Sequence, residues 1–186
     1  MLLYIKNMVC SRCKMAVEAE IINQGFHPKR VDLGEVEILE EIDLVQRQTL
    51  EMALLRYGFS LINNRKGRII EKVKNLLTQL VQEQHIELKQ NLSDYLSERM
   101  TLDYTYLSNL YTHEEGMTIE HYFIGQKIEK VKELLMYDEL TLSQIADKLN
   151  YSSVAYLSTQ FKRVTGMTPS SFKKTKADKR TPIDSL

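Results

Sequence analysis

One stretch of this sequence occurs twice, with corresponding positions fifty residues apart. The identical pairs are Leu92-Ser93 and Leu142-Ser143, Tyr106-Leu107-Ser108 and Tyr156-Leu157-Ser158, and Gly116-Met117-Thr118 and Gly166-Met167-Thr168. In the same register Tyr111 corresponds to Phe161, and Tyr122 to Phe172. A match at a fixed period predicts one supersecondary unit used twice. Because each copy is patterned as helix, short break, helix and glycine stop, we expect two helix-turn-helix units.

In the second copy, apolar residues at helical spacing predict two packed helices. The first begins at a capping box formed by Thr141 and Gln144. After a turn at 150–152, Ser152 or Ser153 is expected to cap the second helix. The positions expected to face the core are Leu142, Ile145, Ala146, Leu149, Leu157, Phe161 and Val164.

Further helices are expected around the two copies. Residues 69–81 carry a strong amphipathic pattern, and a long helix over 118–137 joins the copies. The apolar positions of the first pattern are Ile69, Ile70, Val73, Leu76, Leu77, Leu80 and Val81. Thr168 followed by Pro169 is typical of a helix start, with proline at the first helical position. The buried positions expected in the long helix are Ile119, Phe123, Ile128, Val131, Leu134 and Leu135.

Charge is unevenly distributed along the 186 residues, although the net charge is zero. Residues 1–66 hold nine basic and nine acidic side chains, and residues 67–140 have a net charge of −5. Residues 141–186 hold eight basic and three acidic side chains, a net charge of +5. This asymmetry predicts that an anionic partner binds the second copy of the repeat.

The second helix of the second copy carries residues suited to DNA. The small side chains of Ala155, Ser158 and Thr159 permit close approach to base edges. Lys162 and Arg163 follow and can contact phosphates. A plain helical bundle with a solvated polar face explains one such copy equally well. Two copies in register, joined by a long helix, favour DNA.

Residues 128–174 resemble the signature region of the AraC/XylS family, and they read IEKVKELLMYDELTLSQIADKLNYSSVAYLSTQFKRVTGMTPSSFKK. The resemblance covers about 69–174 and implies two recognition helices in successive major grooves of double-stranded DNA. The second is 153–165, and its base-facing residues are Val154, Ala155, Ser158 and Thr159. The first is 103–115, and its base-facing residues are Thr105, Ser108 and Asn109.

The first copy departs from the family pattern near the end of its recognition helix. At the positions of Lys162 and Arg163 it has Thr112 and His113, followed by two glutamates. Acidic side chains repel phosphate and weaken binding. The first unit is therefore expected to bind DNA weakly, read a distorted groove, or contact a protein; the sequence leaves these alternatives open.

Residues 1–66 show a different pattern, in which short strands alternate with helices. Strands are expected at 2–8, 31–33, 36–38 and 59–62, and helices at 11–24 and 44–57, with Leu50, Ala53, Leu54 and Tyr57 on one face. The order β-α-β-β-α-β predicts a ferredoxin-like α+β module. The polar cluster at 63–67 is the expected boundary with an all-α double helix-turn-helix domain.

Cys10 and Cys13 form a Met-x-Cys-x-x-Cys motif between the first strand and the first helix. Two thiolates at this spacing can converge on one soft ion, Cu(I) before Zn(II). The helix N-terminus and Arg12 also favour thiolate chemistry, and a thioredoxin-like redox pair has the same spacing. A packing or dimerisation module with two surface thiols is the remaining alternative.

The module resembles a heavy-metal-associated domain over about residues 2–63. The motif lies in the corresponding loop, and the segment 55–59, Leu-Arg-Tyr-Gly-Phe, is similar to that family's ending. The resemblance implies that Cys10 and Cys13 bind a metal ion. Asn7 replaces the usual glycine before the methionine, and the hairpin around Gly34 is unusually short.

Together these patterns predict three regions: a sensor domain at 1–66, an AraC-type DNA-binding domain at 67–174, and a disordered tail at 175–186. We expect a cytoplasmic transcription regulator without enzymatic activity or membrane attachment, controlled by metal or thiol state at the cysteine pair. Double-stranded DNA, RNA polymerase and a second copy of the chain are the expected partners. The alternative is a metal chaperone or thiol redox protein with a helical adaptor.

Overall fold

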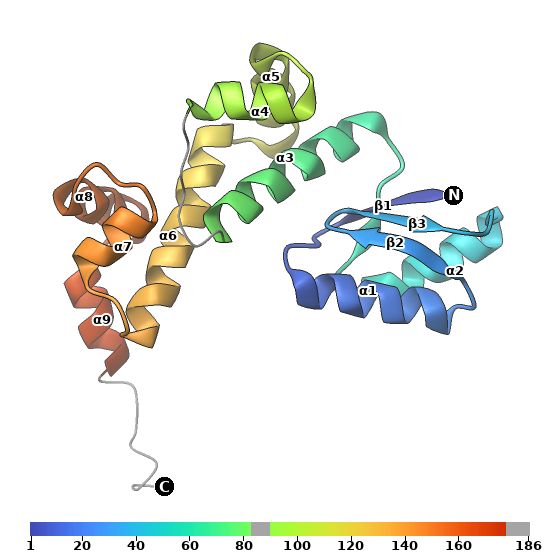
Figure 1. Cartoon of the computed structure of the whole chain (residues 1–186), viewed down its shortest axis with the longest axis horizontal. Helices are drawn as coiled ribbons and strands as arrows, with labels where there is room; N and C mark the ends of the chain where they lie inside the picture. Colours follow the sequence, from blue (N-terminus) through green and yellow to red (C-terminus); the bar gives the residue numbers. More distant parts are fainter. Residues whose placement is uncertain (83–89, 178–186) are drawn as a thin grey trace, which may run out of the picture. The chain divides into compact units, whose positions relative to one another are not determined.

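The computed structural model describes residues 1–82 and 90–177 (Figure 1). These residues form two compact units. The first comprises Met1–Gln79 with Leu96–Leu110, and the second comprises the described residues of the ranges 80–95 and 111–186. The expected bounds of a sensor and a DNA-binding domain stay predictions.

The first unit begins with a small sheet and two helices. Its elements are β1 (Leu2–Lys6), α1 (Ser11–Asn23), β2 (Pro28–Asp32), β3 (Glu35–Ile38), α2 (Leu44–Leu55) and β4 (Ser60–Leu61). This confirms the element order expected from the sequence. The four strands pair antiparallel in the order β2-β3-β1-β4. The ferredoxin-like assignment itself stays a prediction.

Both helices cover the same face of this sheet, as Figure 1 shows. Alternate residues of β1 and β3 point toward the helices, since successive strand side chains face opposite sides. The side chains that meet in this core are Leu3, Ile5, Val17, Ile21, Val36, Ile38, Leu50 and Leu54. Burying each such side chain stabilises the module by about 1.5–3 kcal/mol.

Two of the expected boundaries are corrected by the structure. The first strand ends at Lys6 instead of residue 8, because Asn7 adopts a left-handed φ of 74° and Met8 turns into the core. The helix α2 ends at Leu55, so Tyr57 lies beyond it and is exposed rather than on the buried face. The helical periodicity of the sequence therefore continued past the real helix end.

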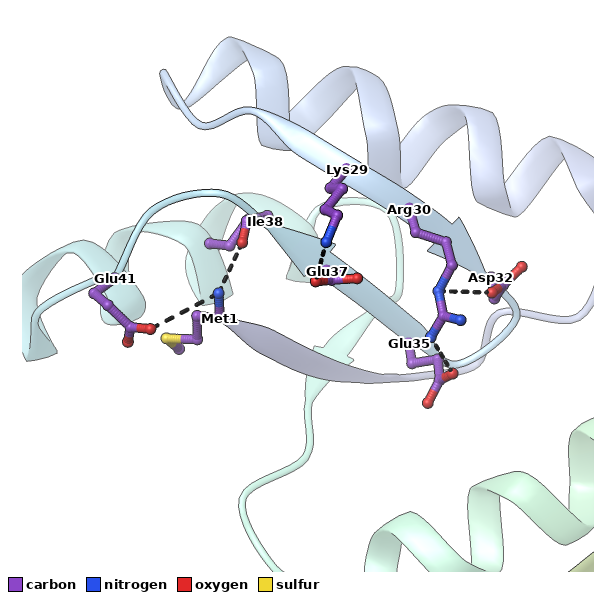
Figure 2. A network of polar contacts seen from close by, with 8 residues as sticks. All are labelled: Met1, Lys29, Arg30, Asp32, Glu35, Glu37, Ile38 and Glu41. Atoms are coloured by element: carbon purple, nitrogen blue, oxygen red, sulfur yellow. Dashed lines mark hydrogen bonds and ion pairs between the residues drawn. The ribbon is translucent and has the colours of Figure 1, made fainter.

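Charged side chains on the β2–β3 hairpin pair with one another (Figure 2). Lys29 Nζ lies 3.0 Å from Glu37 Oε1, and this hydrogen bond, with the lysine's charge, lowers the pKa of the Glu37 carboxyl. Arg30 contacts Glu35 at 3.1 Å and Asp32 at 3.3 Å. The hairpin therefore presents a charged surface whose charges are largely compensated.

The long helix α3 (Arg65–Gln82) buries two different faces. The predicted apolar positions are largely confirmed, since Ile69, Ile70, Val73, Leu77, Leu80 and Val81 are buried and Leu76 is half-buried. Three polar residues spaced at helical intervals, Glu71, Asn75 and Thr78, are buried as well. The sequence pattern did not predict this polar face, because hydrophobic periodicity identifies apolar stripes alone.

The remaining described elements are helices. They are α4 (Leu92–Met100), α5 (Tyr104–Glu115), α6 (Ile119–Tyr137), α7 (Leu142–Lys148), α8 (Val154–Thr165) and α9 (Pro169–Ala177). The starts of α4, α5 and α6 precede those of α7, α8 and α9 by fifty residues each, which confirms the repeat. The helix α9 extends into the range 175–186 that was expected to be disordered; residues 178–186 lie outside the described part.

The expected core positions of these helices are confirmed with three exceptions. Leu134 and Leu142 are half-buried, and Val164 is 47% exposed. Val164 shares a helical face with Leu157 and Phe161 but lies in the last turn of α8. The Val164 side chain therefore lies beyond the residues against which Leu157 and Phe161 pack.

No helix within the described residues combines the length and the apolar composition that a membrane crossing requires.

Candidate functional site

Each copy of the repeat contains a pair of aromatic rings that packs its recognition helix onto the following helix. In the second copy, the rings of Phe161 on α8 and Phe172 on α9 are 5.6 Å apart in an edge-on arrangement. In the first copy, the rings of Tyr111 on α5 and Tyr122 on α6 are 5.9 Å apart and tilted. The packing of these rings restricts rotation of α5 and α8 about their own axes.

The second recognition helix, α8, has well-defined ends. The Ser153 hydroxyl accepts a hydrogen bond from the backbone N–H of Tyr156 at 3.1 Å, so Ser153 is the N-cap, one of the two caps expected from the sequence. Gly166, with a left-handed φ of 79°, ends the helix. Such a cap contributes about 0.5–2 kcal/mol and sets the residue at which the helix starts.

The predicted base-facing residues of α8 are accessible in the structure. Ala155 and Thr159 are exposed, whereas Val154 and Ser158 are half-buried. Ala155, Thr159 and Lys162 are spaced at i, i+4 and i+7, so they line one side of the helix. Their contacts with bases stay predictions, as do the roles of the residues in the first copy.

Lys162 and Arg163 are exposed in the last turn of α8. The helix contains no acidic residue. Its accessible side therefore carries positive charge near the C-terminal end and small or polar side chains nearer the N-terminal end. This arrangement is suited to a duplex, because basic side chains contact phosphates while small polar ones reach base edges.

Tyr156 is an exposed residue of α8 that was not among the predicted site residues. Its ring is 53% exposed, although it lies 6.1 Å from the ring of Tyr151 in the turn. The corresponding Tyr106 on α5 is 47% exposed. The repeat itself was the signal that could have identified this pair, because tyrosine stands at the same position in both copies.

Beneath the second copy, α6 contributes a buried lysine. Lys127 is buried, and its Nζ lies 3.8 Å from the centre of the Tyr151 ring and 5.8 Å from that of Phe123. Burial lowers the pKa of Lys127 from 10.5 to about 8. Burial also raises the pKa of the Tyr151 hydroxyl, whose oxygen makes no hydrogen bond among the described residues.

The buried lysine predicts how stability depends on pH. Between pH 8 and 10.5 the unfolded chain holds a proton on Lys127 that the folded chain does not, so the free energy of unfolding should rise with pH in this window. Replacing Lys127 by methionine should remove this rise and stabilise the chain at pH 7. Urea denaturation of both proteins from pH 7 to 11 measures the effect, and parallel curves would contradict it.

The first copy differs from the second in its turn and in its charge. The helix α4 has nine residues and α7 has seven, and the left-handed residue is Thr101 in one turn and Asn150 in the other. On α5, Thr105 and Asn109 are exposed and Ser108 is half-buried, as needed for contact with a partner; the helix ends His113-Glu114-Glu115.

The two cysteines lie together at the N-terminus of α1. Their Sγ atoms are 3.4 Å apart, and both residues are half-buried. The backbone N–H of Cys13 and then its thiol hold the pKa of Cys10 below its ordinary value, with smaller contributions from Arg12 and against the effect of burial. The spacing thus predicted correctly that the thiols converge.

The cysteine loop is anchored on both sides. The Met8 side chain is fully buried in the core against which Cys13 packs. The backbone N–H of Asn7 donates to Glu71 Oε1 on α3 at 2.7 Å, and its side-chain amide donates to the Gly58 carbonyl at 2.9 Å. Within the described part of the chain, no His, Asp or Glu joins the thiols as a third ligand.

Comparison with known proteins identifies the repeated region. The family model described as "Helix-turn-helix domain" matches residues 96–175. Residues 96–175 therefore form a helix-turn-helix domain, which confirms the corresponding part of the fold prediction. The match begins after the N-terminal module, so the resemblance of residues 2–63 to a heavy-metal-associated domain remains unsupported.

Individual proteins are similar over more than half of this chain. The uncharacterized HTH-type transcriptional regulator YtdP of Bacillus subtilis is 25% identical over 111 residues, which are 59% of this chain and 14% of YtdP. The C-terminal domain of AraT, a response regulator from Geobacillus stearothermophilus, is 25% identical with a TM-score of 0.52, over 60% of this chain and 88% of that domain.

A third protein shares the fold at lower identity. The DNA-binding domain of AdpA, a global transcriptional factor solved in complex with a target DNA, is 15% identical with a TM-score of 0.50. The match covers 63% of this chain and 97% of that domain. The chain thus matches the AraT and AdpA domains over most of their length, but spans only a small part of YtdP.

Proposed function

We propose that this chain is a DNA-binding transcription regulator of the AraC/XylS type. The observation that carries the proposal is the accessible side of α8, on which Ala155, Thr159 and Lys162 are aligned in a helix-turn-helix domain. The similarity to YtdP, an HTH-type transcriptional regulator, and the fold shared with the DNA-binding domain of AdpA, a global transcriptional factor, support it. A metal chaperone or redox protein with a helical adaptor leaves the repeat unexplained.

In this proposal α8 enters the major groove with its N-terminal half against the bases. Ser158 and Thr159 read base edges by their hydroxyls, and Ala155 packs on a thymine methyl where one is present. Lys162 and Arg163 fix the register by contacts to phosphates. The first copy, through α5, binds more weakly or contacts RNA polymerase, because its two glutamates oppose phosphate.

Sequence preference tests this placement. Replacing Ser158 or Thr159 by alanine should relax the preference at one or two base pairs, by about 1–3 kcal/mol where the lost contact is good. Selection of binding sites from random duplexes, followed by sequencing, measures the preference of each variant. If both variants return the motif of the unchanged protein, the proposed docking of α8 is excluded.

We also propose that the thiol or metal state of the cysteine pair controls DNA binding. The donor set fits a soft ion of low coordination number, since two thiols converge at 3.4 Å without a third ligand among the described residues. It does not fit a closed four-coordinate structural zinc site. When bound, Cu(I) would supply a soft charge centre held by Cys10 and Cys13.

The hydrogen bond between Asn7 and Glu71 connects the cysteine loop to α3, and in this proposal it transmits the state of the cysteine pair. Asn7 lies three residues before Cys10, and its N–H donates to the buried carboxylate of α3. A change in the backbone of the cysteine loop therefore alters the contact of that loop with α3. Coupling of this kind amounts to about 1–3 kcal/mol between two sites.

A double substitution of Cys10 and Cys13 by serine tests this second proposal. The unchanged protein should bind about one Cu(I) per chain more tightly than Zn(II), and the variant should bind neither tightly. Competition with a chelating dye measures binding, and a DNA-affinity titration with and without copper measures control. Absence of copper binding below micromolar concentration excludes the metal; tight binding with unchanged DNA affinity excludes the control.

A further inference from the structure

The outer surfaces of α1 and α2 carry a set of apolar side chains that the core does not use. On each helix these residues recur at helical spacing on the side opposite the buried face. Each is more than half exposed; they are Met15, Ile22, Leu44, Val45, Met52 and Leu55. Since α1 and α2 contact each other and cover one face of the sheet, the two stripes form one surface, here named the α1–α2 face.

The amount of apolar surface on this face is that of a protein interface. At about 60–120 Å² for each apolar side chain, six that are more than half exposed present on the order of 400 Å². A standard interface covers about 800 Å² per partner, of which roughly 60% is apolar. The α1–α2 face therefore supplies most of the apolar area that one partner contributes.

The charged residues beside the two apolar stripes suit a second copy of the same chain as the partner. On α1, Arg12 lies at one edge of the stripe and Glu18 at the other. On α2, Glu51 lies at one edge, and Arg56, the residue that caps the helix, lies at the other. A twofold interface brings the same patch onto itself. With a basic and an acidic edge on each helix, two identical faces can meet with opposite charges opposed.

A lipid surface is a poorer match for the α1–α2 face. Helices that lie on membranes combine an apolar stripe with a polar side rich in lysine and arginine. Residues 1–66 instead hold equal numbers of basic and acidic side chains. The charged hairpin of β2 and β3 is also largely compensated by its own ion pairs, so it supplies no attraction to anionic lipid (Figure 2).

We propose that the α1–α2 face is the dimerisation surface of this chain, with a second copy as its occupant. Two such faces stack into a four-helix layer between two sheets, burying the six apolar side chains of each copy. This proposal goes beyond DNA binding and does not depend on it. Dimerisation through residues 1–66 presents two helix-turn-helix domains to one DNA.

Sedimentation analysis of the full chain without DNA tests the proposal. The unchanged protein should sediment with twice the mass of one chain at micromolar concentrations. Combining Ile22→Glu and Met52→Glu should raise the dimer dissociation constant at least 100-fold, because charges would be buried at the centre of the interface. Leu39→Glu is the control, since Leu39 is at least as exposed as Ile22 and Met52 but lies outside both helices; it should leave the constant unchanged.

Mixing oppositely charged variants separates a lost interface from a lost fold. A chain with Ile22→Lys and Met52→Lys should be monomeric alone, and should form a mixed dimer with the glutamate variant at least tenfold more tightly than either forms its own. A monomeric unchanged protein at about 100 μM, where specific interfaces are occupied, would overturn the proposal. Equal association of the unchanged protein and the glutamate variant would overturn it too. DNA binding is measured separately, so its failure would leave these results unaffected.

Discussion

Replacing Lys162 and Arg163 together by alanine should weaken binding to every DNA sequence by about 10- to 100-fold and flatten the salt dependence by about two units. Each basic side chain that contacts a phosphate releases one counterion, so losing two contacts lowers the slope of log K against log salt concentration by about two. Because phosphates carry no sequence information, the preferred motif should persist. Fluorescence anisotropy with a specific and a random duplex, from 50 to 300 mM salt, measures both quantities.

The matched control is the corresponding pair in the first copy. Replacing Thr112 and His113 by alanine should change the affinity much less and leave the salt slope nearly constant, because neither side chain carries a permanent positive charge. The affinity for a random duplex should therefore fall in the Lys162/Arg163 variant and change little in the Thr112/His113 variant. Equal losses of DNA affinity in the two variants would show that both copies contact DNA in the same way. That result would contradict the prediction based on charge.

The arrangement of the repeated region was predictable because several local signals agreed. The capping box of Thr141 and Gln144 is present, and the Thr168 hydroxyl accepts from the Ser171 N–H at 3.2 Å. Gly116 and Gly166 both adopt the left-handed conformation that ends a helix. Caps and glycine stops depend on a few neighbouring residues, so they can be identified from sequence alone.

The predictions failed where burial depends on residues distant in sequence. Periodicity places Val164 on the buried face of α8, but its exposure depends on where the neighbouring helices end. Lys127 was not predicted to be buried, because its neighbour Tyr151 comes from a turn after the next helix. The same holds for Glu71, whose contact with Asn7 joins residues 64 positions apart.

For the cysteine pair the sequence predicted the geometry but not its consequence. The spacing placed two thiols on one helix end, and their Sγ atoms are close together. The anchoring of the same loop by Asn7 could not be inferred, since it requires the left-handed φ of Asn7 and the position of α3. The motif alone predicted the thiol site. The structure adds the contact of Asn7 with Glu71, through which the proposed control by metal or thiol state can be tested.

Replacing Phe161 by alanine should lower the stability of the second helix-turn-helix by about 3–5 kcal/mol, which is a large part of the 5–15 kcal/mol typical of a domain. The ring is fully buried and packs edge-on against Phe172, so the substitution leaves a cavity and removes an aromatic contact worth about 0.5–1.5 kcal/mol. Hydrogen exchange of the amides of α7, α8 and α9 reports this loss locally.

Val164→Ala is the control for Phe161→Ala, because both residues lie on the same helical face of α8 and differ in exposure. An exposed side chain loses little on truncation, so the free energy of unfolding should change by less than about 0.5 kcal/mol. DNA affinity of the Phe161 variant should recover at low temperature, where the weakened domain is still folded, if the ring only positions α8. A similar loss of protection in both variants would mean that Val164 is covered in solution. The exposed side of α8 would then extend less far than the structure indicates.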